Sequence, residues 1–245
     1  MAESRSIFQF KGFALEHGDP GLKIGTEACI FGAYLSQWAH GKMLEIGTGS
    51  GVLTAMIAQL HPFEPIITTE IIPEVADLAQ KNFNNLPFHH QIQVKHTDFK
   101  TFHSDQKFDF VFSNPPFFIN HLSNSSKSKQ TAMHSDELSP EELISNIMRF
   151  VNKGTEIALI YPVEVMEKIL IEVRRKEEEG RNKRFYVKER IQIIPKEGGK
   201  VLREIVLMSQ EEKSESFFRL IVKNKQNEYT EEFKELLRPY YLIFP

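Results

Sequence analysis

The chain has 245 residues, of which 41% are hydrophobic and 26% charged, with a formal net charge of −3. This composition excludes collagen-like, disordered and disulfide-rich proteins, and no apolar run is long enough for a membrane span. The first six residues lack the apolar stretch of a secretory signal, and the single cysteine, Cys29, can form no internal disulfide. We therefore expect a cytoplasmic protein without a thiolate metal site, and one that does not coat nucleic acid non-specifically.

From residue 42 onward the sequence alternates patterns typical of strands and helices. Strands are predicted at residues 42–46, 65–70, 92–96, 108–113 and 157–161, and helices at 52–60, from 73 to about 86, from 140 to about 150 and at 164–179. Ser139 and Pro140 fit the N-cap and first position of the third helix. Such alternation predicts a parallel sheet covered on both faces.

The C-terminal part of the chain changes character. Strands are predicted at 184–194, 201–209 and 217–223, with Gly198-Gly199 as a hairpin turn and Thr230 as the cap of a short helix. This pattern predicts an antiparallel edge on an otherwise parallel sheet. Residues 120–135 are polar and predict a long loop, of a kind that is usually functional or disordered.

The segment Leu44-Glu-Ile-Gly-Thr-Gly-Ser-Gly51 lies between the first predicted strand and helix. Its glycines let the backbone approach a ligand, and the N–H groups at the helix start can bind it. The G-x-G-x-G spacing differs from the G-x-G-x-x-G of dinucleotide sites. Because Glu45 suits a cationic cofactor better than a pyrophosphate, the loop favours S-adenosylmethionine (AdoMet). A generic strand-to-helix turn and a nicotinamide-dependent enzyme are the alternatives.

Two acidic residues follow the next two predicted strands. Glu70 ends the second strand, where a carboxylate can accept hydrogen bonds from both ribose hydroxyls. Asp98 follows the third strand and can accept from an adenine amino group, while Phe99 can pack on the ring. Either acidic residue alone is also typical of a solvated strand end, but their order and spacing favour a cofactor site.

The sequence Asn114-Pro115-Pro116-Phe117 follows the fourth predicted strand. Two prolines end a strand and leave carbonyl groups unpaired. The Asn114 amide oxygen and the Pro115 carbonyl can then both accept from one conjugated NH₂ group and stabilise the positive charge that grows during methyl attack. Phe117 offers a face on which a planar base stacks. A simple turn is the alternative.

These motifs resemble those of class I AdoMet-dependent methyltransferases that methylate amino groups, on adenine N6, guanine N2 or the glutamine N5 of release factors. The resemblance implies a Rossmann-like α/β fold with a seven-stranded, mostly parallel sheet and an antiparallel C-terminal edge. The implied cofactor-binding residues are Lys23, Gly25, Thr26, Glu45, Gly47, Thr48, Gly49, Gly51, Glu70, Ile71, Asp98, Phe99 and Asn114. The implied catalytic residues are Asn114, Pro115, Pro116 and Phe117.

A narrower resemblance covers nearly the whole chain. The segments at residues 8–17, 23–26, 134–139 and 229–242 are similar to tRNA (adenine-N6) methyltransferases that modify the anticodon loop of a valine tRNA. In that family a Val-Gly-Thr-Asp run closes over the methionine end of the cofactor, and here Glu27 stands in place of the Asp. The resemblance offers Phe8, Phe10, Lys11, His134 and Arg203 as substrate contacts. Packing within the fold is the alternative for the phenylalanines and for His17.

Residues 174–188 carry seven basic and three acidic side chains. Such a run can hold RNA phosphates, and the alternative is a solvated helix end with intrahelical ion pairs.

The sequence thus predicts one methyltransferase domain over residues 1–245. Residues 1–40 would close over cofactor and substrate, 41–161 would form the cofactor-binding and catalytic core, and 162–245 would add a helix and antiparallel strands. The predicted reaction is AdoMet-dependent N6-methylation of an adenine in tRNA by a monomer without metal or membrane contact. The same chemistry on rRNA guanine N2 or protein glutamine N5, and a catalytically idle RNA-binding protein, are the alternatives.

Overall fold

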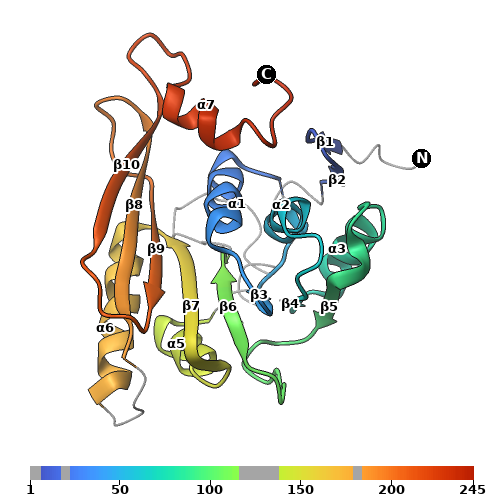
Figure 1. Cartoon of the computed structure of the whole chain (residues 1–245), viewed down its shortest axis with the longest axis vertical. Helices are drawn as coiled ribbons and strands as arrows, with labels where there is room; N and C mark the ends of the chain where they lie inside the picture. Colours follow the sequence, from blue (N-terminus) through green and yellow to red (C-terminus); the bar gives the residue numbers. More distant parts are fainter. Residues whose placement is uncertain (1–6, 18–22, 116–137, 179–183) are drawn as a thin grey trace, which may run out of the picture.

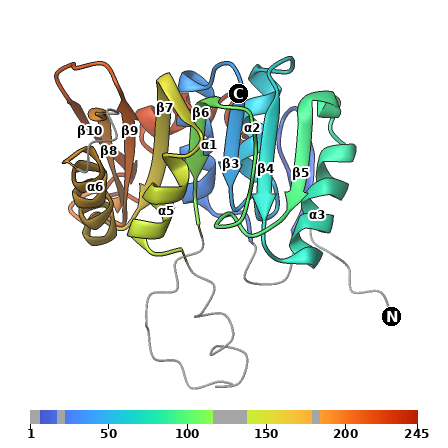
Figure 2. The same ribbon diagram turned by 90° about the horizontal axis from the view of Figure 1, so that it is seen from below.

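The computed structural model describes residues 7–17, 23–115, 138–178 and 184–245. Eight strands form one sheet in the order β10-β8-β9-β7-β6-β3-β4-β5, which Figure 2 shows side by side. Their bounds are β3 (Met43–Ile46), β4 (Ile66–Glu70), β5 (Ile92–His96), β6 (Phe108–Ser113), β7 (Val151–Tyr161), β8 (Tyr186–Lys196), β9 (Arg203–Ser209) and β10 (Ser216–Lys223). A separate antiparallel pair is formed by β1 (Ile7–Gln9) and β2 (Ala14–Glu16).

Helices cover both faces of the sheet. One core cluster joins β1–β2 with α1 (Thr26–Trp38), α2 (Val52–Leu60), α3 (Pro73–Asn84) and α7 (Glu231–Leu237). The other cluster contains α5 (Pro140–Ile147) and α6 (Val163–Glu178). A short 3₁₀ helix, η2 (His89–Gln91), precedes β5. Figure 1 shows α7 beside α1, close to the C-terminus.

Local sequence signals account for several of these elements. All four residues of β3 are buried, as expected for a central parallel strand covered on both faces. The predicted cap of α5 is confirmed: Ser139 and Glu142 form a reciprocal capping box, with Pro140 in the first turn. Thr230 likewise accepts a hydrogen bond from the Phe233 N–H and caps α7.

The predicted α/β class is confirmed, but the sheet differs in two details. It has eight strands, as many as the strand segments predicted from the sequence pattern but one more than the resemblance implies, and the outermost strand β10 is parallel to β8. The predicted hairpin joins β8 to β9, yet antiparallel β9 inserts between β7 and β8 and is not the outermost strand. Strand order depends on contacts between distant segments, which the local pattern does not contain.

The helix α1 was not predicted from the sequence. Its residues 29–33 are all buried, so the segment lacks the alternation of polar and apolar faces by which a helix is recognised. Gly32 lets α1 pack closely on α2, because a Cβ there would lie 2.6 Å from the Met56 sulfur.

Candidate active site

The sheet register brings the predicted motifs to one edge. Ile46, the last residue of β3, pairs with Thr69 of β4 on one side and with Ser113 of β6 on the other. The Ser113 hydroxyl also donates to the Ile46 carbonyl at 2.8 Å. The residues that follow, Gly47 and Asn114, therefore leave neighbouring strands at the same level. Ligands of open α/β sheets bind at such carboxyl edges, where the strand order reverses.

The glycine loop is held against β4. The N–H groups of Gly47 and Thr48 both donate to the Thr69 carbonyl, at 2.9 and 3.0 Å. Gly47, Gly49 and Gly51 have φ angles of 73°, 55° and 88°, a region that favours glycine. A Cβ at Gly47 or Gly49 would meet nothing within 4 Å, so the loop leaves room for a ligand there.

Gly51 allows close packing between the glycine loop and α3, because a Cβ there would lie 2.5 Å from the Phe83 ring. A second link to α3 is Asn82, which the sequence did not single out. Its amide donates to the Ser50 carbonyl at 2.9 Å and exchanges two hydrogen bonds with the Glu16 backbone. Asn82 thus ties β2 to the glycine loop, a connection between segments too distant for sequence spacing to reveal.

Glu45 is buried beneath this loop, with 1% of its surface exposed. One carboxylate oxygen, Oε2, accepts from the Thr48 and Thr54 hydroxyls at 2.7 and 2.6 Å. The other, Oε1, has no hydrogen-bond partner in the described structure. Burial raises the pKa of Glu45 to about 8, although the two hydroxyls act in the opposite direction. The carboxyl is therefore neutral near pH 7 unless a cation approaches it.

Glu70 joins the glycine loop to the start of α3. Its Oε2 accepts from the Gly49 N–H at 3.0 Å, and its Oε1 accepts from the Ile71 and Ile72 N–H groups at 3.0 and 3.1 Å. Ile71 and Ile72 remain 39% and 37% exposed and offer an apolar surface beside the carboxylate. Ile72 was missed in the sequence, where an exposed apolar pair after a strand is an available signal.

Asp98 lies at the same edge but Phe99 does not face it. The Thr97 N–H donates to the Glu70 carbonyl at 2.8 Å, which places Asp98 close to the end of β4. Asp98 is partly exposed, and its Oδ1 accepts from the Lys100 N–H at 2.8 Å. Phe99 is only 4% exposed and packs on Phe150, with 5.8 Å between ring centres. The expectation that Phe99 packs on a cofactor ring is therefore wrong, because its ring belongs to the core.

Only part of the predicted catalytic motif is described. Asn114 and Pro115 are half-buried directly after β6. Pro116, Phe117, His134 and the predicted loop at 120–135 lie outside the described residues.

Phe8, Phe10 and Lys11 near the N-terminus all make contacts within the fold. Phe10 is fully buried and stacks on Phe13 with 4.5 Å between ring centres, and Phe8 is partly buried against Phe10. The Lys11 ammonium donates to the Arg238 and Phe244 carbonyls. The burial of Phe10 corrects the expectation that it touches substrate, whereas Lys11 remains exposed and its substrate contact stays a prediction.

Further along, the Ile24 N–H donates to His17 Nδ1 at 3.3 Å, in agreement with a structural role for this histidine. Cys29 is fully buried, and burial raises the pKa of its thiol to about 12, as expected for an unreactive core residue.

The segment before α1 reaches the edge where the glycine loop lies. Gly25 is the N-cap of α1, Thr26 is its first residue, and Lys23 precedes them as an exposed side chain. Arg203 Nε lies 3.0 Å from Glu27 Oε2. Because β9 is antiparallel to β7, its first residue Arg203 lies at the carboxyl end of β7. The start of α1 and Arg203 thus meet at the candidate site's edge of the sheet.

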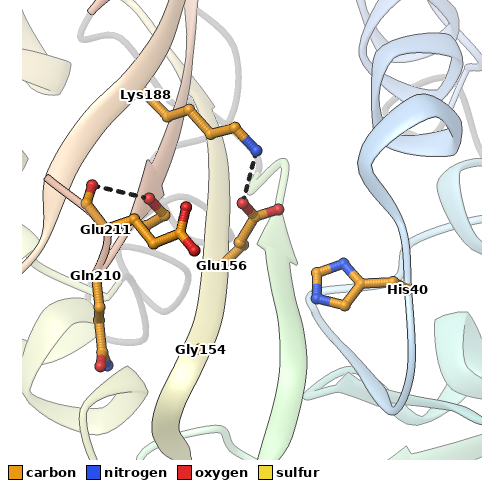
Figure 3. Close-up of a pocket in the computed structure, with 7 residues that line it drawn as sticks. His40, Gly154, Glu156, Lys188, Gln210 and Glu211 are labelled. Carbon is orange, nitrogen blue, oxygen red and sulfur yellow. Dashed lines mark hydrogen bonds and ion pairs between the residues drawn. The ribbon is translucent and has the colours of Figure 1, made fainter. Parts of the chain in front are cut away.

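A cavity of about 310 Å³ lies at the opposite edge (Figure 3). It is lined by His40, Gly154, Glu156, Lys188, Ser209, Gln210 and Glu211. Lys188 forms an ion pair with Glu156 at 2.8 Å, and Arg175 pairs with Glu172 and Glu141. Parts of the basic run at 174–188 are therefore neutralised, which favours the ion-pair interpretation for these two residues over RNA binding.

Across the described ranges no group of histidine, cysteine or acidic side chains is placed to hold a metal ion. Within the same ranges no helix has the length and apolar character needed to cross a bilayer.

The candidate site defines a class I AdoMet-dependent methyltransferase, and comparisons with known proteins agree. A model of the methyltransferase small domain matches residues 21–138. A predicted O-methyltransferase from Agrobacterium tumefaciens superposes with a TM-score of 0.66 at 17% identity, over 86% of this chain and 95% of that one. An O-methyltransferase from Bacillus cereus, solved in complex with SAH, gives 0.52 at 17% identity, over 78% and 84% of the two chains. At such identities the likeness concerns the fold alone.

Proteins related to this chain by sequence indicate a narrower family than the fold does. A tRNA1(Val) (adenine(37)-N6)-methyltransferase of Bacteroides thetaiotaomicron is 30% identical, over 96% of this chain and 97% of its own. A protein with the same name from Actinobacillus pleuropneumoniae serotype 7 is also 30% identical, over 96% and 97% of the two chains. The chain belongs to this family of methyltransferases, which confirms the family predicted from the sequence.

Proposed function

We propose that this protein transfers the methyl group of AdoMet to the N6 amino group of an adenine in the anticodon loop of a valine tRNA. The observation that carries the proposal is the register of β3 with β6, which sets Asn114 beside the glycine loop. The relatives' names supply the substrate, and the Asn-Pro-Pro-Phe motif supplies chemistry suited to a conjugated amine.

The residues at the carboxyl edge fit AdoMet. Open space lies over Gly47 and Gly49, and the buried Glu45 Oε1 has no hydrogen-bond partner within the described residues. These two features suit a ligand that carries positive charge. In the proposal, Gly47, Thr48 and Gly49 hold the methionine end together with Lys23, Gly25 and Thr26. Glu70 accepts from the ribose, and Ile71 and Asp98 hold the adenine.

AdoMet supplies a methyl group on a positively charged sulfur. When bound here, AdoMet would donate this methyl group to the N6 nitrogen, and the electron pair of the carbon–sulfur bond would stay on sulfur. The Asn114 amide oxygen and the Pro115 carbonyl accept hydrogen bonds from the NH₂ group and stabilise the positive charge that develops on nitrogen. The extra proton then leaves to water. The target adenine must leave its stack, which an anticodon loop permits more easily than a duplex.

The proposal includes three further expectations. The chain acts as a single domain over residues 1–245, as a monomer, and in the cytoplasm. The first is supported by the core cluster that joins Phe10 and Leu15 near the N-terminus to Phe233 and Tyr240 near the C-terminus.

The test is transfer of labelled methyl groups from AdoMet to unmodified bulk tRNA, followed by nucleoside mass spectrometry. We expect N6-methyladenosine from the wild-type protein, and none from Asn114→Ala, although this variant still binds AdoMet by calorimetry. Asn84→Ala, on the exposed face of α3, is the matched control and keeps full activity. Turnover by Asn114→Ala would remove the proposed role of this side chain.

Label in rRNA guanine or in a protein amide instead of tRNA would refute the substrate and favour one of the alternative amines. AdoMet binding with no transfer to any of the three would favour an idle RNA-binding protein.

A further inference from the structure

Two lysines lie opposite each other at the carboxyl ends of β8 and β10. Lys196 and Lys223 are register partners in the parallel pairing of these strands. Neighbouring strands are about 4.8 Å apart, and partner side chains project from the same face. Like charges placed directly opposite on adjacent strands destabilise a sheet. An anion bound between the two ammonium groups would remove this repulsion.

The acidic side chains nearby do not neutralise this pair. Glu197 lies 3.8 Å from Lys225, and Glu27 is paired with Arg203 at 3.0 Å. Among the residues that the structure describes, Lys196, Lys200 and Lys223 form no ion pair with a carboxylate. The Lys223 ammonium instead lies 5.0 Å from the centre of the Tyr229 ring. This part of the edge therefore carries an excess of positive charge.

The turn beside the lysines is well defined. The Gly199 N–H donates to the Lys196 carbonyl at 2.8 Å, and Gly198 has a φ of 79°, which favours glycine. A Cβ at Gly199 would lie 2.8 Å from the same carbonyl oxygen. At the base of the hairpin, the Leu202 N–H donates to the Ile193 carbonyl at 2.9 Å. The turn fixes the backbone at Lys196 and Lys200 before a ligand arrives, which lowers the backbone entropy lost on binding.

The lysines share the edge of the candidate active site. β8 and β10 run parallel to β6, so their last residues lie at the edge from which Asn114 emerges. Lys196 is three strands from β6 and Lys223 is four, about 14 and 19 Å across the sheet, and the strand register sets both six residues beyond the level of Ser113, about 20 Å further along the strands. Figure 2 shows these strands side by side between β6 and β10. A tRNA with one base at Asn114 can reach both lysines with phosphates that lie several nucleotides from that base.

We propose that Lys196, Lys200 and Lys223, here called the lysine edge, bind backbone phosphates of the tRNA whose adenine enters the active site. The proposal rests on the proposed function, which supplies the RNA. Phosphate contacts fix the position and orientation of a nucleic acid without reading its sequence. The lysine edge would thus orient the anticodon region relative to Asn114, while the active site selects the base.

The experiment compares two double variants of the full-length protein. Lys196→Gln/Lys223→Gln removes the opposed pair, and Lys42→Gln/Lys153→Gln removes two exposed lysines at the opposite edge, with the same change in net charge. The dissociation constant for an unmodified valine tRNA transcript is measured over a range of salt concentrations. Because each lysine–phosphate contact contributes about 1 to the slope of log K against log salt, we expect the first variant to lower its magnitude by about 2.

We expect the control to keep the wild-type slope. Methylation assays should show a raised KM for tRNA in the first variant, with kcat and AdoMet affinity unchanged. Its melting temperature should not fall, because the substitution removes a repulsion. A merely structural role for the two lysines would instead lower the melting temperature and leave the salt slope as in the wild type.

Equal slopes for the two variants, whether both changed or both unchanged, would overturn the proposal. Its failure is distinguishable from failure of the proposed function. If the wild-type protein binds tRNA without methylating it, the function is wrong while the slopes still decide whether the lysine edge binds. If it binds no tRNA at all, both are overturned.

Discussion

Glu45→Gln tests whether the carboxyl beneath the glycine loop is neutral. The glutamine keeps the shape of the protonated acid and can still accept from the Thr48 and Thr54 hydroxyls. Burial raises the pKa of Glu45 from 4.5 to about 8 in the folded protein. Because the folded state favours the protonated carboxyl, this group contributes stability that is fully present below its unfolded pKa. That contribution is lost as the pH rises toward about 8.

The size of the effect follows from these two values. Between the unfolded pKa of 4.5 and the folded pKa of about 8, each pH unit changes the free energy of unfolding by about 1.4 kcal/mol. Between about pH 5 and pH 7 the wild-type protein should therefore lose about 2 to 3 kcal/mol relative to Glu45→Gln. The glutamine does not titrate, so the variant should be the more stable protein at neutral pH.

The assay is urea denaturation of both proteins across this pH range, without AdoMet. Glu74→Gln, which changes an exposed carboxyl on α3, gives the background of a surface substitution. Parallel stability curves for wild type and Glu45→Gln would show that Glu45 is ionised in the folded protein and would refute the reasoning.

Three further predictions follow from the packing of the site. Gly51→Ala should cost about 2 kcal/mol or more in urea denaturation, because its Cβ would overlap the Phe83 ring at a left-handed φ; wild-type stability would contradict this. Phe10→Ala should lower the free energy of unfolding by about 3 to 5 kcal/mol without raising the KM for tRNA. Ile7→Ala, at an exposed position, should change neither quantity. A raised KM for Phe10→Ala would support contact of Phe10 with the substrate. Glu70→Ala should weaken AdoMet binding at least tenfold by calorimetry, and Glu70→Gln should weaken it less. Unchanged affinity in Glu70→Ala would contradict the proposed hydrogen bonds between Glu70 and the ribose.

Local sequence determined the main features of this protein. The glycines at 47, 49 and 51, the acid at the end of β4 and the Asn-Pro motif after β6 are contiguous or regularly placed signals. They depend on φ angles, strand ends and helix starts, which neighbouring residues control. The α/β class and the caps of α5 and α7 were predicted for the same reason.

Burial and strand order were decided only by the tertiary structure. Phe10 and Phe99 are conspicuous next to functional motifs, yet both lie in the core, because the face on which a ring packs depends on segments far away in the chain. The same holds for Glu45, whose ionisation depends on how deeply the loop is covered.

The insertion of β9 between β7 and β8, and the pairing of β10 with β8, bring Lys196 opposite Lys223, 27 positions later in the chain. Sequence periodicity reports which residues share a face of one element. It does not report which elements become neighbours, since that depends on how the whole chain buries its apolar surface.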